Sequence, residues 1–218
     1  MSMQAIVNGK EETVLSVAEM RAADAYTIAH FTSGRVLMHR AAEGIYHAAP
    51  SWQGRIAILA GGGNNGGDGY ALACILADVG AAFDLFAVSE KLSEDGAYYC
   101  AQAQAKGARI LPFTEQTRLE GYDILVDCLL GTGVHGPARG RMREAIACIK
   151  AARQAGAFVI AADINSGMDG DTGEAECAVS SDLTVSIGYY KTGLLTPAAA
   201  ARIQRLRNVE IGIVLPAT

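Results

Sequence analysis

Residues 61–69 combine six glycines with Asn64, Asn65 and Asp68, and they follow a short apolar run at 56–60. Glycine allows a backbone to approach a ligand closely, and the free N–H groups at the start of a helix attract anions. A carboxylate would repel a phosphate, so we expect Asp68 to bind a hydroxyl or a cation, or only to cap the following helix. This stretch therefore predicts a site for a polar, partly anionic ligand.

Two further apolar runs end in polar side chains. Asp127 closes the first run, and the stretch 131–133 after it offers free N–H groups that suit a phosphate, or simply makes a tight turn. Asp163 closes the second run, and Ser166 follows it. A carboxylate at the end of an apolar strand is costly unless it is paired or bound, so both are candidate acids, bases or cation ligands. Oxygen ligands with few charges favour a monovalent cation or Mg²⁺ over zinc.

These residues need a scaffold that brings distant strand ends together. Apolar runs that alternate with helical spacing predict βαβ units and a parallel sheet, in which ligands bind beyond the carboxyl ends of the strands. We therefore predict a three-layer α/β/α, Rossmann-like, mostly parallel sheet, and the polar loops meet if their strands are neighbours. The predicted strands are 56–60, 83–88, 109–111, 123–127, 158–163, 183–187 and 209–214. The predicted helices between and after them are 70–79, 93–106, 141–154 and a weak one near 198–206.

Two helices are predicted ahead of the sheet. Residues 1–14 are predicted to be a polar lead-in without regular structure. Ser16 and Glu19 then fit a capping box at the start of the first helix, and the second is predicted over residues 36–47. These helices either pack plainly against the sheet or form a lid or a dimer surface.

Composition limits the class of protein. The chain has 218 residues, half of them hydrophobic, and we find no linker or internal repeat, so we predict one domain over residues 1–218. A net charge of -5 without a run of lysine and arginine argues against broad nucleic-acid binding. We find no membrane-spanning run or leader pattern, and five scattered cysteines without CxxC spacing indicate reduced thiols, so we expect a cytoplasmic protein that does not bind membranes.

Basic side chains offer fewer candidates. The histidines at 30, 39, 47 and 135 are not spaced as metal ligands, although His135 falls in the candidate phosphate loop. Lys191 lies in a predicted loop, where it would either reach an anionic ligand or be solvated.

Three motifs together resemble the YjeF N-terminal domain family, the NAD(P)H-hydrate epimerases. They are Gly61–Gly69, Val126–Gly133 and Ala162–Gly167, and the similarity extends to Met20–Asp24 and Leu37–Ala42 in the predicted leading helices. The resemblance implies repair of hydrated NADH and NADPH by interconversion of the R and S epimers at C6 of the reduced nicotinamide ring.

The resemblance also implies roles for individual residues. One potassium ion per subunit would be held by Asn65, Asp127 and Ser166, and Asp163 would contact the substrate. It further implies a homodimer, and a separate ATP- or ADP-dependent dehydratase that acts on the product. The residues implied to line the substrate site are Asn64, Asn65, Gly66, Gly67 and Asp68, and those implied to cradle phosphate are Gly131, Thr132, Gly133, Val134, His135, Gly136 and Pro137.

The reaction sets a chemical requirement. Expelling the C6 hydroxyl as water leaves a cation stabilised by the ring nitrogen, and water then returns from either face. This step needs a carboxyl group as general acid and then base, with negative charge nearby. Asp163 is the first candidate for proton transfer, and Asp127 would contribute charge through the cation site. The chain departs from the family pattern at His39 where an acid is common, at Ala42 where glycine is usual and at Asn165 where proline is usual, and the loop 135–139 does not align with it.

Two other functions remain open from the sequence. The chain could be a catalytically silent nucleotide-binding or scaffold module of the same fold, although its polar loops are intact. It could also be an NAD-dependent oxidoreductase, because residues 61–66 match GxGxxG. That pattern calls for an acid at the end of the second strand to bind the ribose, and Glu90 lies beyond it.

Overall fold

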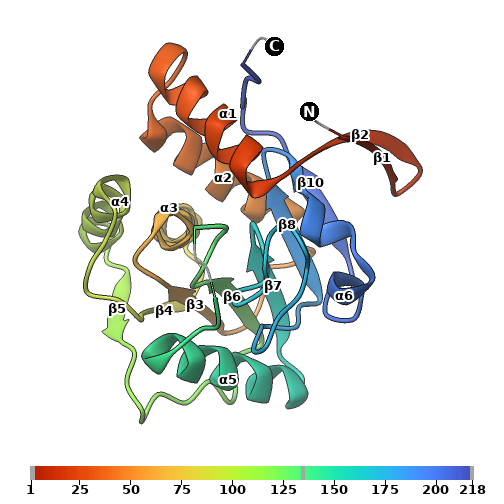
Figure 1. Ribbon diagram of the computed structural model, residues 1–218. Coiled ribbons are helices and arrows are strands. Elements are labelled where there is room, and N and C mark those ends of the chain that lie inside the picture. Colours follow the sequence, from red (N-terminus) through yellow and green to blue (C-terminus); the bar gives the residue numbers. More distant parts are fainter. Residues whose placement is uncertain (1–2, 134–135, 217–218) are drawn as a thin grey trace.

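The central feature of the computed structural model, which describes residues 3–133 and 136–216, is a parallel sheet of seven strands (Figure 1). Its order is β10-β8-β7-β6-β3-β4-β5, and every neighbouring pair is parallel. The strands are β3 (Ile56–Ala60), β4 (Phe83–Ala87), β5 (Arg109–Pro112), β6 (Ile124–Cys128), β7 (Phe158–Ala162), β8 (Leu183–Ile187) and β10 (Leu206–Val209). Every residue of β3, β6 and β8 is buried, as expected for strands covered on both faces.

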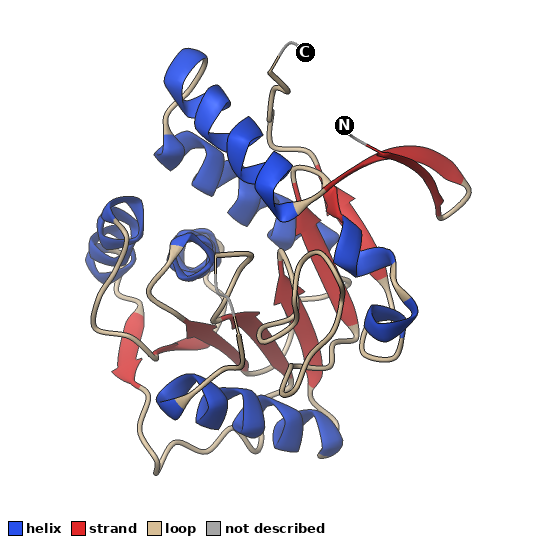
Figure 2. Ribbon diagram, viewed as in Figure 1, coloured by secondary structure: helices blue, strands red, loops and turns tan. Residues whose placement is uncertain are grey.

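Helices cover both faces of this sheet (Figure 2). On one face lie α2 (Gly34–Ala48), α3 (Asn64–Asp78) and α4 (Glu94–Ala105), and on the other lies α5 (Gly140–Gln154). Ile58 and Val126 belong to the hydrophobic core under the first group, whereas Leu59 and Leu125 belong to the core under α5. This alternation follows from the two-residue period of a strand. The predicted three-layer α/β/α fold is confirmed.

Helix α1 (Val17–His30) lies beside α2 and reaches the carboxyl end of the sheet (Figure 1). The predicted capping box is present, since the Ser16 side chain accepts a hydrogen bond from the Glu19 backbone and the Glu19 side chain accepts one from the Ser16 backbone. Ser33 caps α2 in the same way, with its hydroxyl accepting from the Val36 N–H group. Two caps in succession fix where the helices begin and how the chain turns between them.

The first residues of the chain correct one prediction. Residues 1–14 were expected to be a polar lead-in, but from residue 3 the structure forms an antiparallel hairpin of β1 (Met3–Val7) and β2 (Lys10–Leu15). Its turn residues Asn8 and Gly9 both have positive φ, the geometry that favours asparagine followed by glycine. β2 then pairs in parallel with β9 (Tyr190–Lys191), so this strand is held by a partner far along the sequence.

The end of the chain corrects two more predictions. The last strand was expected at 209–214 but is β10, and residues 210–216 are not in a strand. Gly212 has a φ of 89°, which bends the backbone, and Ile211 and Ile213 pack in the core as an irregular segment. The weak helix expected near 198–206 is the single turn α6 (Pro197–Ala200), which follows the 3-10 turn η1 (Thr192–Leu195).

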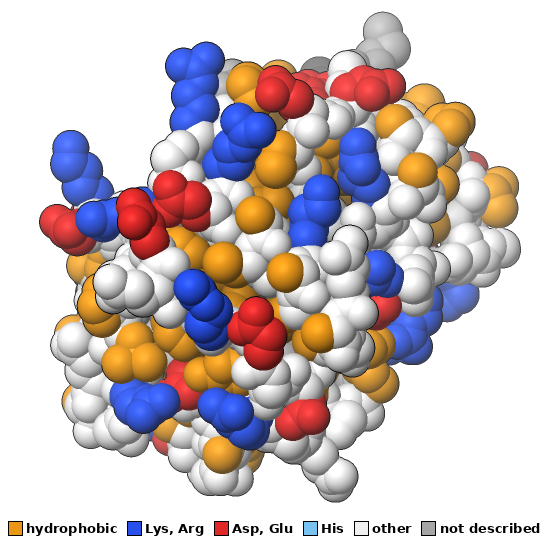
Figure 3. Space-filling view, turned by 90° about the horizontal axis from the view of Figure 1, so that it is seen from below, with side chains coloured by type: hydrophobic (Ala, Val, Ile, Leu, Met, Phe, Trp, Pro, Cys, Tyr) orange, Lys and Arg blue, Asp and Glu red, His pale blue; other side chains and the backbone are white. Residues whose placement is uncertain are grey.

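Surface and thiol chemistry agree with the composition. On the face seen from below, lysine and arginine side chains are interspersed with aspartate and glutamate (Figure 3). All five cysteines are free. Across residues 3–133 and 136–216, the structure contains no helix that is both long and apolar enough to cross a membrane.

Candidate functional site

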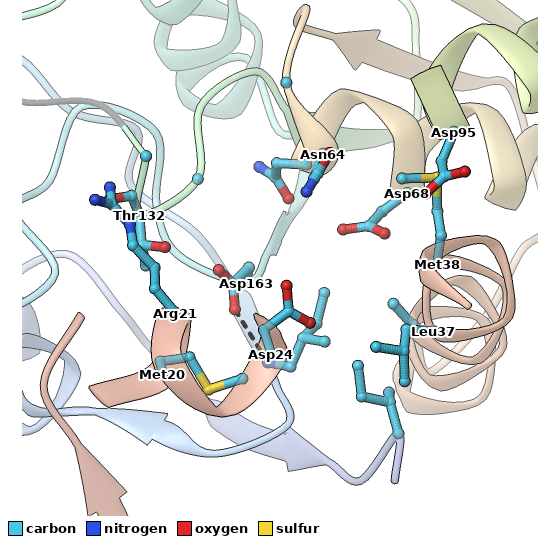
Figure 4. Close-up of a pocket in the computed structure, with 18 of the residues that line it drawn as sticks. Met20, Arg21, Asp24, Leu37, Met38, Asn64, Asp68, Asp95, Thr132 and Asp163 are labelled. Carbon is cyan, nitrogen blue, oxygen red and sulfur yellow. Dashed lines mark hydrogen bonds between the residues drawn. The ribbon is translucent and has the colours of Figure 1, made fainter. Parts of the chain in front are cut away.

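The strand order brings the three polar loops together. β3, β6 and β7 are neighbours in the sheet, so the segments that follow them meet at one edge, as predicted. A cavity of about 410 Å³ opens there, between these segments and helices α1 and α2 (Figure 4). The helical wall consists of Met20, Arg21, Asp24, Ile28, Gly34, Leu37, Met38 and Ala41.

The glycine-rich segment begins α3 rather than forming a loop as far as Gly69. Gly63 occupies the N-cap position, and the helix starts at Asn64. The first N–H group of this segment to bond back is that of Gly67, which donates to the Gly63 carbonyl, so the turn before it presents free N–H groups. Asp68 lies in the second turn and is therefore not a helix cap, which excludes the purely structural role considered from sequence.

Close packing explains why a helix starts with so many glycines. A Cβ at Gly66 would lie 2.0 Å from the Gly61 carbonyl oxygen, and a Cβ at Gly67 would lie 2.4 Å from the Met38 methyl group. Neither glycine has a positive φ, so what these positions require is the missing side chain. Gly66 and Gly67, predicted to line the substrate site, are not among the residues that line the cavity, and they act by letting α3 approach its neighbours.

Asp163 is held in an uncommon conformation beside the cavity. Its φ is +65°, a region that residues other than glycine seldom adopt and that costs free energy. One carboxylate oxygen accepts hydrogen bonds from the Lys191 ammonium group and from the backbone N–H of Ile187, the latter at 3.2 Å. Lys191 is 1% exposed and also donates to the Ile187 carbonyl at 2.7 Å, so it is neither solvated nor free to bind an anion. The ion pair fixes a negative charge at the cavity wall.

Two other carboxyl groups point into the same cavity without partners. Asp68 comes from α3 and Asp24 from α1 (Figure 4), and neither side chain has a hydrogen bond to another described residue. Burial raises the pKa of Asp68 well above its usual range, and the charges of Asp163 and Asp24 raise it further. Burial, followed by the charge of Asp163, also raises the pKa of Asp24. The cavity thus combines the fixed carboxylate of Asp163 with two unpartnered carboxyl groups whose pKa values are raised.

A cluster of buried oxygen ligands lies beside this cavity. The Ser166 hydroxyl donates to one oxygen of Asp127 at 2.5 Å, and the Ser166 N–H donates to the other at 2.9 Å. Both side-chain polar atoms of Asn65 are buried without a partner in the structure. Asn65 lies against Gly131, while the Ser166 hydroxyl bonds to the adjacent Leu130, so one loop connects the two.

The chemistry of this cluster suits a singly charged ion. It contains one carboxylate, and the described residues form no group of three or more histidine, cysteine, aspartate or glutamate side chains that could hold a metal. Burial raises the pKa of Asp127 to about 6, because its partners compensate only part of the lost hydration. A cation at this position would neutralise Asp127 and would be bound by the Asn65 side-chain oxygen, which has no other partner. Asn65, Asp127 and Ser166 therefore fit the potassium ion that the family resemblance implies.

The candidate phosphate loop is only partly at the cavity. Gly131, Thr132 and Gly133 line it, and Gly136 and Pro137 border a neighbouring hollow of about 210 Å³. Val134 and His135, which were predicted to contribute, lie outside the described residues. Arg21 of α1 donates to the Thr132 carbonyl at 2.7 Å and forms no ion pair with another described residue. A cation without a counter-charge therefore lies next to this loop.

Of the sequence-predicted substrate residues, the structure brings together Asn64, Asn65, Asp68, Gly131, Thr132, Gly133 and Asp163 around one cavity. Asp127 and Ser166 are fully buried and do not line it. Sequence reasoning assigned no role to Arg21 or Asp24, although both lie in the stretch Met20–Asp24 that contributed to the resemblance. An aspartate one turn after the buried Met20 and directly after the buried Ala23 was the available indication that this part of the helix meets a site.

His39 and Asn165, two of the departures from the family pattern, lie away from the cavity. His39 is exposed on α2, 3.6 Å from Glu43, and stacks on Tyr99. Asn165 is fully buried, where its amide nitrogen donates to the Val179 carbonyl and the Ser181 hydroxyl and its oxygen accepts from Thr184. Its hydrogen bonds are satisfied by the loop after β7, so it takes part in positioning Ser166 without facing a ligand.

Comparison with known proteins agrees with this geometry. A protein named NAD(P)H-hydrate epimerase from Rhodopirellula baltica is 37% identical over 84% of this chain and 77% of its own length. One of the same name from Limosilactobacillus fermentum is 31% identical over 89% of this chain and 95% of its own length. A bifunctional NAD(P)H-hydrate repair enzyme from Coxiella burnetii is 36% identical over 81% of this chain, but the match spans only 37% of that longer protein.

A solved structure and a family model support the same assignment. The crystal structure of the yeast protein YNL200c superposes with a TM-score of 0.74 over 88% of this chain and 86% of that one, at 19% identity, which supports the fold. Residues 34–193 match the family described as YjeF-related protein N-terminus. With most of its length matched by the family and by relatives above 30% identity, the chain belongs to the YjeF-related N-terminal family.

Proposed function

We propose that this protein is an NAD(P)H-hydrate epimerase, which interconverts the R and S forms of hydrated NADH and NADPH at C6 of the reduced ring. The observation that carries the proposal is the convergence of Asp24, Asp68 and Asp163 on one cavity beside the buried cluster of Asn65, Asp127 and Ser166. The names of the relatives from Rhodopirellula and Limosilactobacillus support the same activity.

The cavity has two parts, which suit different portions of the substrate. The N–H groups at the start of α3 and in 131–133, together with the guanidinium of Arg21, suit the phosphates of a dinucleotide. The apolar side chains of Met20 and Leu37 lie near the carboxyl groups and suit the reduced ring. This orientation places C6 of the ring among the acids.

The three acids differ in what they can do. Asp163 is paired with Lys191, so it supplies a fixed negative charge that favours the cationic ring after water has left. Proton donation to the departing hydroxyl requires a protonated carboxyl group, and the raised pKa values of Asp24 and Asp68 favour that state. We therefore assign charge stabilisation to Asp163, in place of the proton transfer expected for it from sequence.

A potassium ion is part of the proposal. Asn65, Asp127 and Ser166 would hold it, and it would supply a positive charge that balances Asp127 and steadies the loop after β6. The described residues of that loop, 129–133, line the cavity, so their position affects binding of the substrate. This role makes Asp127 a residue that positions the site through the cation.

The assay follows one epimer at a time. A mixture of R and S hydrated NADH is treated with a stereospecific dehydratase to remove the S form, and loss of the R form is followed by chromatography with and without this protein. Acceleration by the protein, larger in potassium than in lithium, is the expected result. A protein that binds NADPH without accelerating the loss would instead be a catalytically silent member of the family.

Several finer features belong to the proposal. Ile28, Phe31 and Val36 are exposed apolar residues on α1 and α2, which supports a homodimer through these helices, tested by light scattering. Five free cysteines support a cytoplasmic location. The bifunctional repair enzymes among its relatives support a dehydratase as the activity that consumes its product.

A further inference from the structure

Helix α1 contributes to the cavity although it lies outside residues 34–193, the segment that matches the family. Arg21 and Asp24 are three residues apart and both line the cavity, so one face of the helix is directed at the ligand. The Asp24 carboxyl group has no hydrogen bond to another described residue, in contrast with Asp163. A half-buried acid without a partner weakens the fold unless it serves a ligand.

Asp24 faces the cavity from a different wall than Asp68. Figure 4 shows the Asp24 side chain rising from α1 and the Asp68 side chain extending from α3, with both carboxyl groups directed into the space between the two helices. Asp163, which lines the same cavity, is bonded to Lys191. A planar ring in this space would have one partner-free carboxyl group on each side.

We propose that Asp24 is a catalytic residue that transfers the proton on one face of the reduced ring, while Asp68 transfers it on the opposite face. The inference rests on the proposed epimerase function and adds to it the identity and placement of the two acids. Two acids are what the chemistry requires, because inversion at C6 means that water leaves from one face and returns to the other.

Each step balances in protons and electrons. In the state with Asp24 protonated and Asp68 ionised, the Asp24 carboxyl group gives its proton to the C6 hydroxyl of one epimer, the C–O bond breaks with its electron pair, and water leaves. The lone pair of the ring nitrogen forms a C=N double bond, which leaves a cation beside the Asp163 carboxylate. Water then forms a new C–O bond on the other face, gives a proton to the Asp68 carboxylate, and the lone pair returns to nitrogen. The enzyme is left with its proton on Asp68, the form that acts on the other epimer.

The test separates loss of water from inversion. Each epimer is incubated in water enriched in oxygen-18 with the wild type, Asp24→Asn or Asp68→Asn, and chromatography with mass spectrometry measures inversion and label incorporation against a protein-free blank. We expect both variants to lose inversion by about 100-fold or more. The remaining acid can still expel water and return it on its own face, so each variant should incorporate label without inversion into one epimer, and the two variants into opposite epimers.

Controls distinguish this pattern from damage to the fold. Asp78→Asn, at an exposed aspartate paired with Lys106 at the end of α3, should keep the inversion rate within about twofold. A structural role for Asp24 would lower inversion and label incorporation together for both epimers, and that result would overturn the proposal. Unchanged inversion in Asp24→Asn would overturn it as well.

Inversion and label incorporation by the wild type alone distinguish the two-acid mechanism from the epimerase function on which it rests. Inversion without label incorporation would refute the two-acid mechanism and leave the epimerase intact. Absence of any acceleration over the blank would refute both. Complementary labelling in the two variants is the single pattern that supports the pair.

Discussion

Acids at the two ends of the sheet differ in their hydrogen-bond partners. Near the amino end of β4, Asp84 accepts hydrogen bonds from Arg109 and from the Tyr122 hydroxyl. Burial alone would raise the pKa of Asp84, but these two partners outweigh it and lower the pKa. At the carboxyl end, Asp24 and Asp68 have no such partners and their pKa values are raised. Asp68 and Asp84 are equally exposed, at 9%, yet their pKa values shift in opposite directions.

The difference separates acids that stabilise the fold from acids that have no partner until a ligand binds. A buried carboxylate with charge-assisted hydrogen bonds repays its lost hydration, whereas an unpartnered one lowers stability. Natural proteins retain such costs mainly where function needs them. The comparison predicts that substitutions at the carboxyl end change turnover, while substitutions at the amino end change stability.

The largest effect is expected at Asp163, the acid of the cavity that is paired with a buried lysine. Asp163→Asn should lower kcat for epimerisation by about 1,000-fold, because the charge that favours the cationic ring is lost. It should also lower the free energy of unfolding by roughly 3 kcal/mol, because Lys191 is left buried without a counter-charge. Single-turnover kinetics and urea unfolding measure the two losses separately.

A second substitution divides these two effects. In Asp163→Asn combined with Lys191→Met, the buried ammonium is gone, so stability should recover while kcat does not. Recovery of turnover in the double variant would show that Asp163 serves only to neutralise Lys191, and it would remove the distinction drawn for the carboxyl end.

An intermediate effect is expected at the amino end. Tyr122→Phe removes the hydroxyl that donates to Asp84 and should lower the free energy of unfolding by about 1–2 kcal/mol at pH 7, with kcat unchanged. Because the folded-state pKa of Asp84 is lowered, its contribution is present above the unfolded pKa and is lost as the pH falls through the folded value. The difference between wild type and variant should therefore shrink in acid. A loss of kcat at unchanged stability would contradict the comparison.

The smallest effect concerns the cation. Burial raises the pKa of Asp127 to about 6, so between about pH 4 and 6 the folded state binds more protons than the unfolded state. Without a bound cation, stability should fall as the pH rises through this window. Potassium at about five times its Kd should restore about 1 kcal/mol at pH 8, and much less at pH 5, where the proton competes. Thermal unfolding in potassium and in lithium measures this.

A matched variant tests whether Asp127 carries the effect. In Asp127→Asn the difference between potassium and lithium should disappear at both pH values. If the variant still responds to potassium as the wild type does, the cation binds elsewhere, and the cluster of Asn65, Asp127 and Ser166 is structural only.

Much of the scaffold could be predicted from sequence because its pattern is local. Strands such as β6 and β7 are short apolar runs bounded by turn residues. The polar residues that close these runs are Asp127 and Asp163. Parallel topology then implied that these ends meet. The neighbouring positions of β3, β6 and β7 confirm that step.

The features that sequence did not reveal depend on contacts between distant segments. Strand β2 is stabilised by β9, about 175 residues later, and its own sequence, KEETVL, begins with charged residues. The start of α3 has glycines where helix propensity disfavours them, and only the approach of Met38 and of the Gly61 carbonyl explains them. Asp24 could be assigned to the site only once α1 was seen to lie over the cavity.

The pairing of β2 with β9 has a practical consequence for shortened versions of this protein. Leu15 is in register with Lys191, the residue whose ammonium group holds Asp163. A version shortened to start at residue 16 would leave one edge of β9 without hydrogen bonds, although the seven-stranded sheet would be intact. A purification tag or fusion partner that displaces the hairpin would likewise disturb the position of Lys191, so the amino end is a poor place to attach a probe.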